Sequence, residues 1–242
     1  MPRSVTYIFV QAAFVLSAGS YAGAEITVES WRVITGIVDT QSSDDPSEFA
    51  VFEDNVVNPF QDSHEVLLGQ SRTSASYDFT WTADTANFHI DTTHFLMELD
   101  GRTITEGRIT VHPAVDSIIA FDAFFDFSWP SAAIGGSILG FSIFDIAMDE
   151  PISSNSDSGG NFDLGAPFGT LALDGSALLL GGRDYLIGYS ARIDHFTPTP
   201  PGTHGDGTGN IHFTITPVPE PATASLLIAG LLLSRRRRRG CP

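Results

Sequence analysis

Apolar and polar residues alternate with a period of two over much of the segment from residue 26 to residue 216, and this pattern limits the folds open to the chain. Successive side chains of a strand point to opposite faces, whereas a helix would need a period of about 3.6 residues. Residues 138–148 are apolar on both faces, as expected of a central strand. We expect the other strands to bury Tyr77, Phe79 and Trp81; Phe95, Met97 and Leu99; Phe121, Ala123, Phe125, Phe127 and Trp129; Tyr185, Ile187, Tyr189, Ala191 and Ile193; and Ile211, Phe213 and Ile215.

Turn-forming residues separate these strands at short intervals. Asp100 and Gly101 both tolerate positive φ and predict a tight hairpin. We expect residues 41–70 to form an irregular excursion or short edge strands. Residues 197–210 are rich in proline and glycine, which predicts a surface loop. About ten strands joined in this way predict one all-β domain over residues 25–217, an antiparallel β-sandwich with a jelly-roll-like arrangement.

The charge of this domain narrows the classes of partner. All 12 basic residues of the chain are arginines, and between Glu25 and Val218 there are six of them against 28 carboxylates, a formal charge of −22. Such a surface repels polyanions, so we expect no nucleic-acid partner, while cations and neutral glycans remain. Cys241 is the one cysteine of the chain. The domain must therefore be held together by its core, without a disulfide.

The N-terminal residues have the three regions of a secretory signal peptide. Arg3 supplies the positive start, residues 7–16 are apolar apart from Gln11, and small residues lead to Ala22 and Ala24. Small side chains at these two positions are what signal peptidase requires. We expect cleavage after Ala24, which leaves Glu25 as the new N-terminus and makes residues 1–24 a leader. The alternative is an ordinary buried helix, but the apolar run has no amphipathic period.

The C-terminal segment, residues 218–242, combines three features. An extended motif comes first, then an uncharged apolar stretch over residues 222–234, which predicts a short helix, and then a run of arginines that resists crossing a membrane. The motif consists of Val218, Pro219, Glu220 and Pro221, and the stop-transfer cluster consists of Arg235, Arg236, Arg237, Arg238 and Arg239. This combination resembles the PEP-CTERM sorting signal of exported bacterial proteins. The resemblance implies an inner-membrane intermediate, an exosortase-type processing enzyme as partner, and delivery to the cell surface or extracellular matrix. A permanent, uncut anchor is the alternative.

Candidate chemical sites in the domain are weak. Asp157, Asn161 and Asp163 offer oxygen ligands at the spacing of a small calcium loop, but calcium needs six to eight oxygens, and a plain hairpin turn explains the same residues. No other cofactor is predicted. On one strand His89 and Asp91 share a face while His94 takes the other, so the three cannot converge on zinc, and we expect solvated histidines.

The aromatic residues allow two interpretations. Exposed together, they would form a platform for stacking sugars; their period-two placement beside phenylalanine and isoleucine favours core packing instead. The residues concerned are Trp31, Trp81, Trp129, Tyr185 and Tyr189. With no catalytic constellation in the sequence, the leading prediction is a non-enzymatic exported surface or matrix protein. The alternatives are a carbohydrate-binding module of an exopolysaccharide matrix and a glycan-active hydrolase, which would need two carboxylates in a cleft.

Overall fold

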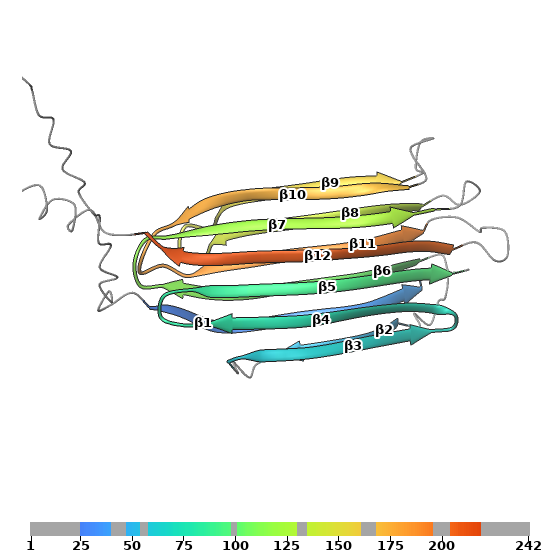
Figure 1. Ribbon diagram of the computed structural model, residues 1–242, viewed down its shortest axis with the longest axis horizontal. Helices are drawn as coiled ribbons and strands as arrows, with labels where there is room; N and C mark the ends of the chain where they lie inside the picture. The colour runs from blue at the N-terminus through green and yellow to red at the C-terminus, as the bar shows by residue number, and fades with distance from the viewer. Residues whose placement is uncertain are drawn as a thin grey trace, which may run out of the picture.

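Two antiparallel sheets of six strands each form a β-sandwich (Figure 1). The computed structural model describes residues 25–39, 47–53, 58–97, 101–129, 135–160, 168–195 and 204–218. Sheet A has the order β2 (Ser47–Glu53), β1 (Ile26–Asp39), β6 (Gly101–Pro113), β11 (Tyr185–His195), β8 (Gly135–Asp145) and β9 (Glu150–Gly160). Sheet B has the order β10 (Phe168–Leu179), β7 (Ser117–Ser128), β12 (His204–Pro217), β5 (Ala86–Met97), β4 (Ser71–Trp81) and β3 (Phe60–Leu68).

The last eight strands are wound as a jelly roll, which confirms the predicted fold class. Strands β5 and β6, β7 and β8, β9 and β10, and β11 and β12 each face one another across the core. This gives two four-stranded sheets, β6-β11-β8-β9 and β5-β12-β7-β10, in the order that a jelly roll requires. Strands β1 to β4 widen both sheets on one side, so the predicted excursion at residues 41–70 contains the edge strands β2 and β3.

The core lies between the sheets and is largely aromatic. Phe121 stacks on Phe141 with ring centroids 4.2 Å apart, and Phe88 stacks on Phe213 at 4.5 Å. Burial of each such ring contributes roughly 2–3 kcal/mol. Hydrogen bonds between hydroxyls also join the sheets: those of Thr35 on β1 and Tyr77 on β4 lie 2.6 Å apart, and those of Thr92 on β5 and Thr105 on β6 lie 2.7 Å apart. The burial predicted from the alternating pattern is confirmed for β7, β11 and β12, and for Tyr77 and Phe79 of β4, while Trp81 is half-buried.

In β5 the predicted faces are reversed. The sequence suggested that Phe95 and Met97 point inward, but His94 and Leu96 are buried and Phe95 and Met97 are half-buried on the outer face. The alternation that begins at Phe88 and Ile90 runs on through Thr92 without a bulge, and this fixes the later residues. A run of three consecutive apolar residues does not by itself indicate which of them point into the core.

The predicted loop at residues 197–210 is wrong in its second half, because β12 begins at His204. Gly205 and Gly207 lie inside this strand, where a Cβ atom would come within 2.4 Å of the ring of Trp129 and 2.3 Å of the ring of Phe125, respectively. Glycine at these positions leaves room for the aromatic rings, so a glycine-rich segment that resembles a loop in composition is in fact part of a central strand.

The prediction of a central strand over residues 138–148 is also too long. Strand β8 ends at Asp145, and Ile146 to Met148 form an exposed turn.

Several predictions concern residues outside the described ranges. They include the leader at residues 1–24, Asp100 of the hairpin, Pro219 to Pro221 of the sorting motif, and the C-terminal segment that follows. Within the described ranges, no helix is both long and apolar enough to span a membrane.

Candidate binding groove on sheet A

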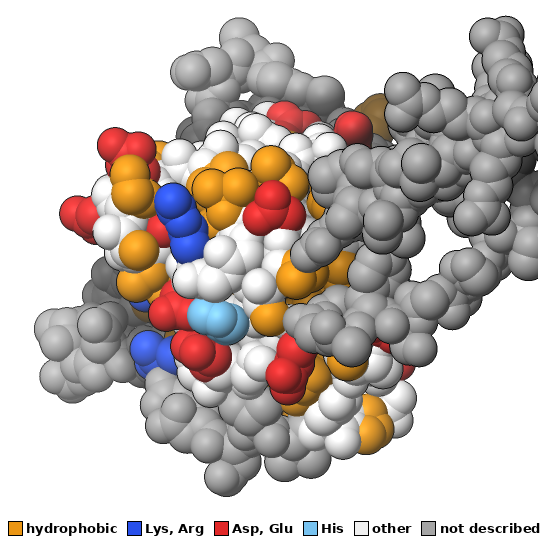
Figure 2. Space-filling model, turned by 90° about the vertical axis from the view of Figure 1, so that its left-hand side faces the viewer, with side chains coloured by type: hydrophobic (Ala, Val, Ile, Leu, Met, Phe, Trp, Pro, Cys, Tyr) orange, Lys and Arg blue, Asp and Glu red, His pale blue; other side chains and the backbone are white. Residues whose placement is uncertain are grey.

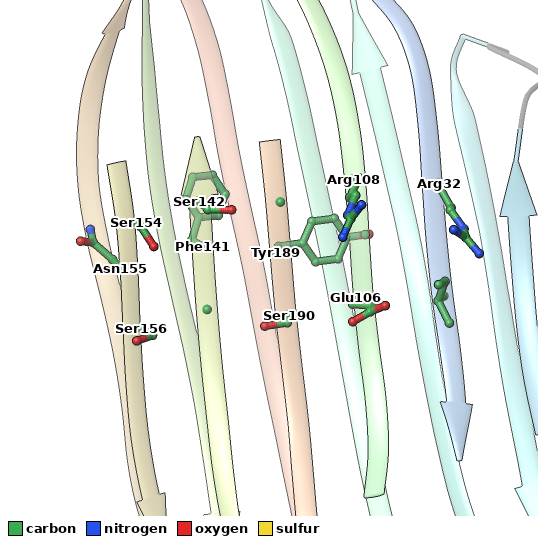
Figure 3. A pocket seen from close by; sticks show the side chains of 14 residues that line it. Arg32, Glu106, Arg108, Phe141, Ser142, Ser154, Asn155, Ser156, Tyr189 and Ser190 are labelled. Atoms are coloured by element: carbon green, nitrogen blue, oxygen red, sulfur yellow. The ribbon is translucent and has the colours of Figure 1, made fainter. Parts of the chain in front are cut away.

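A groove crosses the outer face of sheet A, roughly perpendicular to five of its strands (Figure 3). Its volume is about 360 Å³. Two adjacent rows of cross-strand neighbours form it, as the strand register shows. From β1 through β6, β11 and β8 to β9, the first row is Arg32, Arg108, Gly188, Ser142 and Ser154, and the second row is Ile34, Glu106, Ser190, Gly140 and Ser156.

The groove is hollow because its middle consists of glycine and serine. A Cβ atom on Gly188 would come within 2.8 Å of the Ser142 hydroxyl, and one on Gly140 within 2.9 Å of the Ser190 hydroxyl. Each serine thus lies over the neighbouring glycine, and no larger side chain rises above the sheet here. The neighbouring rows carry larger side chains: Phe144 and Leu186 on one side, Ile138 and Arg192 on the other.

Charged groups gather at the β1–β6 end of the groove, and uncharged polar groups at the β9 end (Figure 3). Arg32 and Arg108 are directly opposite each other on neighbouring strands, and Glu106 is two residues from Arg108. Like charges in this position repel. Arg108 is exposed and has no ion-pair partner among the described residues. Its guanidinium is therefore available to a ligand.

Arg192 differs from Arg108 because its charge is already paired. Its Nε atom lies 3.0 Å from Oδ2 of Asp194, and Arg102 approaches the other carboxylate oxygen at 3.5 Å. Burial raises the pKa of the Asp194 carboxyl, and the two arginines partly oppose this shift. Arg192 is accordingly held in place beside the groove by its ion pair, while the charge of Arg108 can interact with a ligand.

The groove lining contains a single carboxylate, Glu106. Glycoside hydrolysis ordinarily needs two, at a separation of about 5–10 Å. The lining is rich instead in serine hydroxyls, the Asn155 amide and guanidinium groups, which donate and accept hydrogen bonds. The arrangement suits reversible binding of a polar chain.

The aromatic residues do not line the molecule's surface as a platform. Trp31, Trp129, Tyr185 and Tyr189 are all buried, which confirms the core interpretation, and Trp81 is half-buried. Phe141 and Tyr189 lie beneath the groove and belong to the core. Because the Tyr189 ring is fully enclosed, burial raises the pKa of its hydroxyl well above the usual value.

The predicted histidine group is split between two environments. His89 and Asp91 share the outer face of sheet B, with Nε2 of His89 3.2 Å from the carboxylate, and the Asn210 amide donates to Asp91 at 2.9 Å. His94 lies on the opposite, buried face, so the three residues do not converge, as predicted. The prediction that all of them are solvated is wrong for His94, which packs edge-on against Phe125.

The weak calcium candidate is only partly described. Asn161 and Asp163 lie outside the described residues, and residues 157–160 are extended within β9 instead of forming a turn. Asp157 accepts hydrogen bonds from the backbone amide of Ser158 at 2.9 Å and from that of Ala172 on β10 at 3.2 Å. Its carboxylate therefore links the edge strands of the two sheets.

Both ends of the described domain are held in place. The backbone amide of Ala114 donates to the carbonyl of Glu25 at 2.8 Å, and the amide of Val218 donates to the carbonyl of Asp116 at 2.7 Å. Glu25 is the predicted first residue after the leader, and Val218 is the first residue of the predicted sorting motif. Both contacts are made to the connection between β6 and β7.

Sequence reasoning missed the groove. The available signal was a repeated pair of small residues two positions apart: Gly140 and Ser142, Ser154 and Ser156, and Gly188 and Ser190. Spacing of two places each pair on one face of a strand. The pairs are brought together by the register of β11, β8 and β9, and the pairing of β11 with β8 joins strands that are not consecutive in sequence.

Comparison with known proteins gives little information about the function of this chain. No protein-family model matches the chain, and no curated protein matches its sequence. Among solved structures, an arabinose-bound GH51 α-L-arabinofuranosidase is 10% identical over 63% of this chain, with a TM-score of 0.25, and the chain spans only 23% of that enzyme's length. The structure of infectious bursal disease virus, Gx strain, is 11% identical over 90% of this chain and 75% of its own, with a TM-score of 0.23. The fold assignment rests on strand topology, and these likenesses add nothing about ligand or activity.

Proposed function

We propose that this chain is an exported, non-enzymatic binding protein of the cell surface or extracellular matrix, and that it binds a polysaccharide in the sheet A groove. The observation that carries the proposal is the groove itself. Polar side chains line a hollow that crosses five strands, and a jelly roll places this face in open solvent.

The dimensions favour a chain over a single sugar. Four strand spacings of about 4.8 Å separate β1 from β9, so the groove is about 19 Å long. A short oligosaccharide segment fits this length, with its hydroxyls against the serines. Arg108 suits a carboxylate-bearing sugar at the β1–β6 end, since a guanidinium binds a carboxylate through two parallel hydrogen bonds. The long-range repulsion from the acidic body is screened within about 8 Å at physiological salt, so the nearby charge of Arg108 determines whether an acidic sugar is attracted.

Filling the groove tests the proposal. Ser190→Trp should abolish binding to an array of bacterial exopolysaccharide fragments while circular dichroism stays unchanged, because an indole at the centre of the groove occupies the ligand's space. The matched control is Thr208→Trp, which places the same indole on the exposed outer face of sheet B. If both variants bind as wild type does, the groove is not the binding site.

A second variant distinguishes the sugar class. Arg108→Gln should weaken binding of uronate-containing fragments about tenfold and leave neutral fragments unaffected, as expected for loss of one charge-assisted contact. Equal loss for both classes would mean that Arg108 only shapes the groove.

The proposed address rests on the resemblance at the C-terminus and is tested separately. Glu220→Ala should leave the protein inserted in the inner membrane but unprocessed. Replacing Arg235 to Arg239 with serine should let the chain pass uncut into the periplasm, because five arginines resist entry into hydrocarbon by a few kcal/mol each. Fractionation and intact-mass analysis distinguish the two products. Normal surface delivery of both variants, with the tail removed, would rule out sorting by this segment.

A further inference from the structure

Three side chains from distant parts of the sequence meet at one end of sheet A. They are Glu29 of β1, His112 of β6, and Asp184, which directly precedes β11. One ligand-type atom from each lies within 4.8 Å of the other two. Figure 2 looks onto this end of the sandwich and shows acidic side chains beside a histidine. The group is separate from the groove, since none of the three residues lines it.

A β-bulge brings Glu29 to this position. The register between β1 and β6 runs from Val28 opposite Val111 to Ser30 opposite Thr110, so Glu29 is the extra residue without a partner. A bulge redirects a side chain out of the regular alternation. Here Glu29 and Ser30 are two consecutive residues outside the core, and the Glu29 carboxylate lies on the same outer face as His112.

Asp184 is placed by contacts of its own. Its carboxylate Oδ1 lies 2.6 Å from Nδ1 of His112, and its backbone carbonyl accepts a hydrogen bond from the Ile146 amide at 3.0 Å. The neighbouring cation, Arg183, points elsewhere, because its Nη1 atom donates to Asp145 at 2.9 Å. Two carboxylates and one imidazole thus lie together without an intervening positive charge from that side chain.

Other histidines in the molecule provide an internal comparison. Five histidines of the described chain lie within ion-pair distance of an aspartate: His64, His89, His112, His204 and His212. Within the described ranges, only the His112 pair has a third ligand-type side chain within 4.8 Å. A histidine–aspartate pair is therefore common on this surface, whereas the triad is particular to this end.

We propose that Glu29, His112 and Asp184 form a binding site for a zinc-type divalent cation. One imidazole nitrogen and two carboxylate oxygens are a donor set that zinc accepts, with water in the fourth position. Donor atoms around tetrahedral zinc lie about 3.4 Å apart, so closure requires shifts of about 1–1.5 Å in side chains that are exposed or half-buried. The bound ion would tie the start of β1, the end of β6 and the turn before β11 together.

Isothermal titration of the untagged protein with zinc chloride tests the site. We expect the tightest class of zinc sites, meaning those of highest affinity, to hold one ion per chain. Zinc should also raise the melting temperature more than magnesium does at equal ionic strength. Glu29→Gln should weaken this class at least tenfold, because the amide keeps the shape but loses the charge. His112→Ala should remove it.

The matched controls alter a pair that lacks a third ligand. His212 lies 3.2 Å from Asp122, with both side chains exposed, and His212→Ala and Asp122→Asn should leave the tightest class unchanged. Circular dichroism checks that each variant is folded. Equal stabilisation by zinc and magnesium would overturn the proposal, and so would an equal loss of zinc affinity in His212→Ala and His112→Ala.

Discussion

His94 is a titratable residue inside the core. Its side chain is 3% exposed, with Nε2 2.7 Å from the Thr92 hydroxyl and Nδ1 3.2 Å from the Thr73 hydroxyl. Burial lowers the pKa of the imidazole to about 3, because a charged ring would lose its hydration between the sheets. His94 is therefore neutral in the folded protein at neutral and mildly acidic pH.

This neutrality predicts a specific loss of stability in acid. The unfolded chain protonates His94 below a pKa of about 6.5, while the folded protein does not until about 3, so the free energy of unfolding falls as the pH drops between these values. The loss from this residue is about 2 kcal/mol at pH 5. Urea unfolding at pH 7.5 and pH 5 should show it in the wild type, and His94→Gln should lose less by this amount. His212→Gln, at an exposed histidine, should behave as the wild type; parallel loss in all three proteins would contradict the assignment.

At the scale of elements, β12 shows how one strand accommodates its neighbour. Gly207 faces the ring of Phe125 on the adjacent strand β7, and a Cβ atom would lie 2.3 Å from that ring. The aromatic side chain covers the glycine and supplies the packing that the glycine lacks. Sequence composition alone assigns such a segment to a loop.

The close approach predicts a large effect for a small substitution. Gly207→Ala should destabilise the protein by about 2 kcal/mol or more, because the Phe125 ring cannot move without displacing other core residues. The midpoint of urea unfolding measures this. Thr208→Ala, at the next and outward-facing position, should change the free energy of unfolding by less than about 1 kcal/mol. Equal effects would mean that the Phe125 ring does not lie against Gly207.

Strands with a strong aromatic alternation could be predicted from the sequence, and weakly patterned ones could not. The inward face of β7 follows directly from the alternation of Phe121, Ala123, Phe125 and Phe127 with polar or exposed residues. Strand β9, with its serines, asparagine and glycines, has no such pattern, and its extended form depends on pairing with β8. The groove depends on register among β1, β6, β11, β8 and β9, and the metal-ligand triad depends on one bulge. Neither register nor bulge is encoded within a single strand.

At the scale of the whole molecule, charge is the dominant feature. The domain carries 28 carboxylates and six arginines between Glu25 and Val218, and three of these arginines, Arg102, Arg183 and Arg192, are paired with Asp194 or Asp145. The 28 carboxylates outnumber the six arginines, so the arginines offset only part of the mutual repulsion. The free energy gained by burying the apolar core must therefore exceed the free energy that this repulsion costs.

Salt should consequently stabilise the protein. Raising sodium chloride from about 0.02 M to about 0.3 M shortens the screening length several-fold and should raise the melting temperature, because repulsion among carboxylates is relieved more than the few ion pairs are weakened. Differential scanning calorimetry in a buffer without divalent cations measures this. A melting temperature that falls with salt would show that the ion pairs outweigh the repulsion.

Dithiothreitol should not change the melting temperature, since the domain contains no cysteine.

The position of β12 in sheet B has a further consequence, for the order of folding. This strand, the last of the described part of the chain, lies between β5 and β7, so neither partner gains its second neighbour until residues 204–217 have emerged. Strand β11 occupies the same place in sheet A, between β6 and β8. A nascent chain thus holds two half-sheets with open edges, and cooperative folding waits for β11 and β12. Closure of both sheets through such long-range contacts is slow, so the open strand edges stay exposed until β11 and β12 have been synthesised.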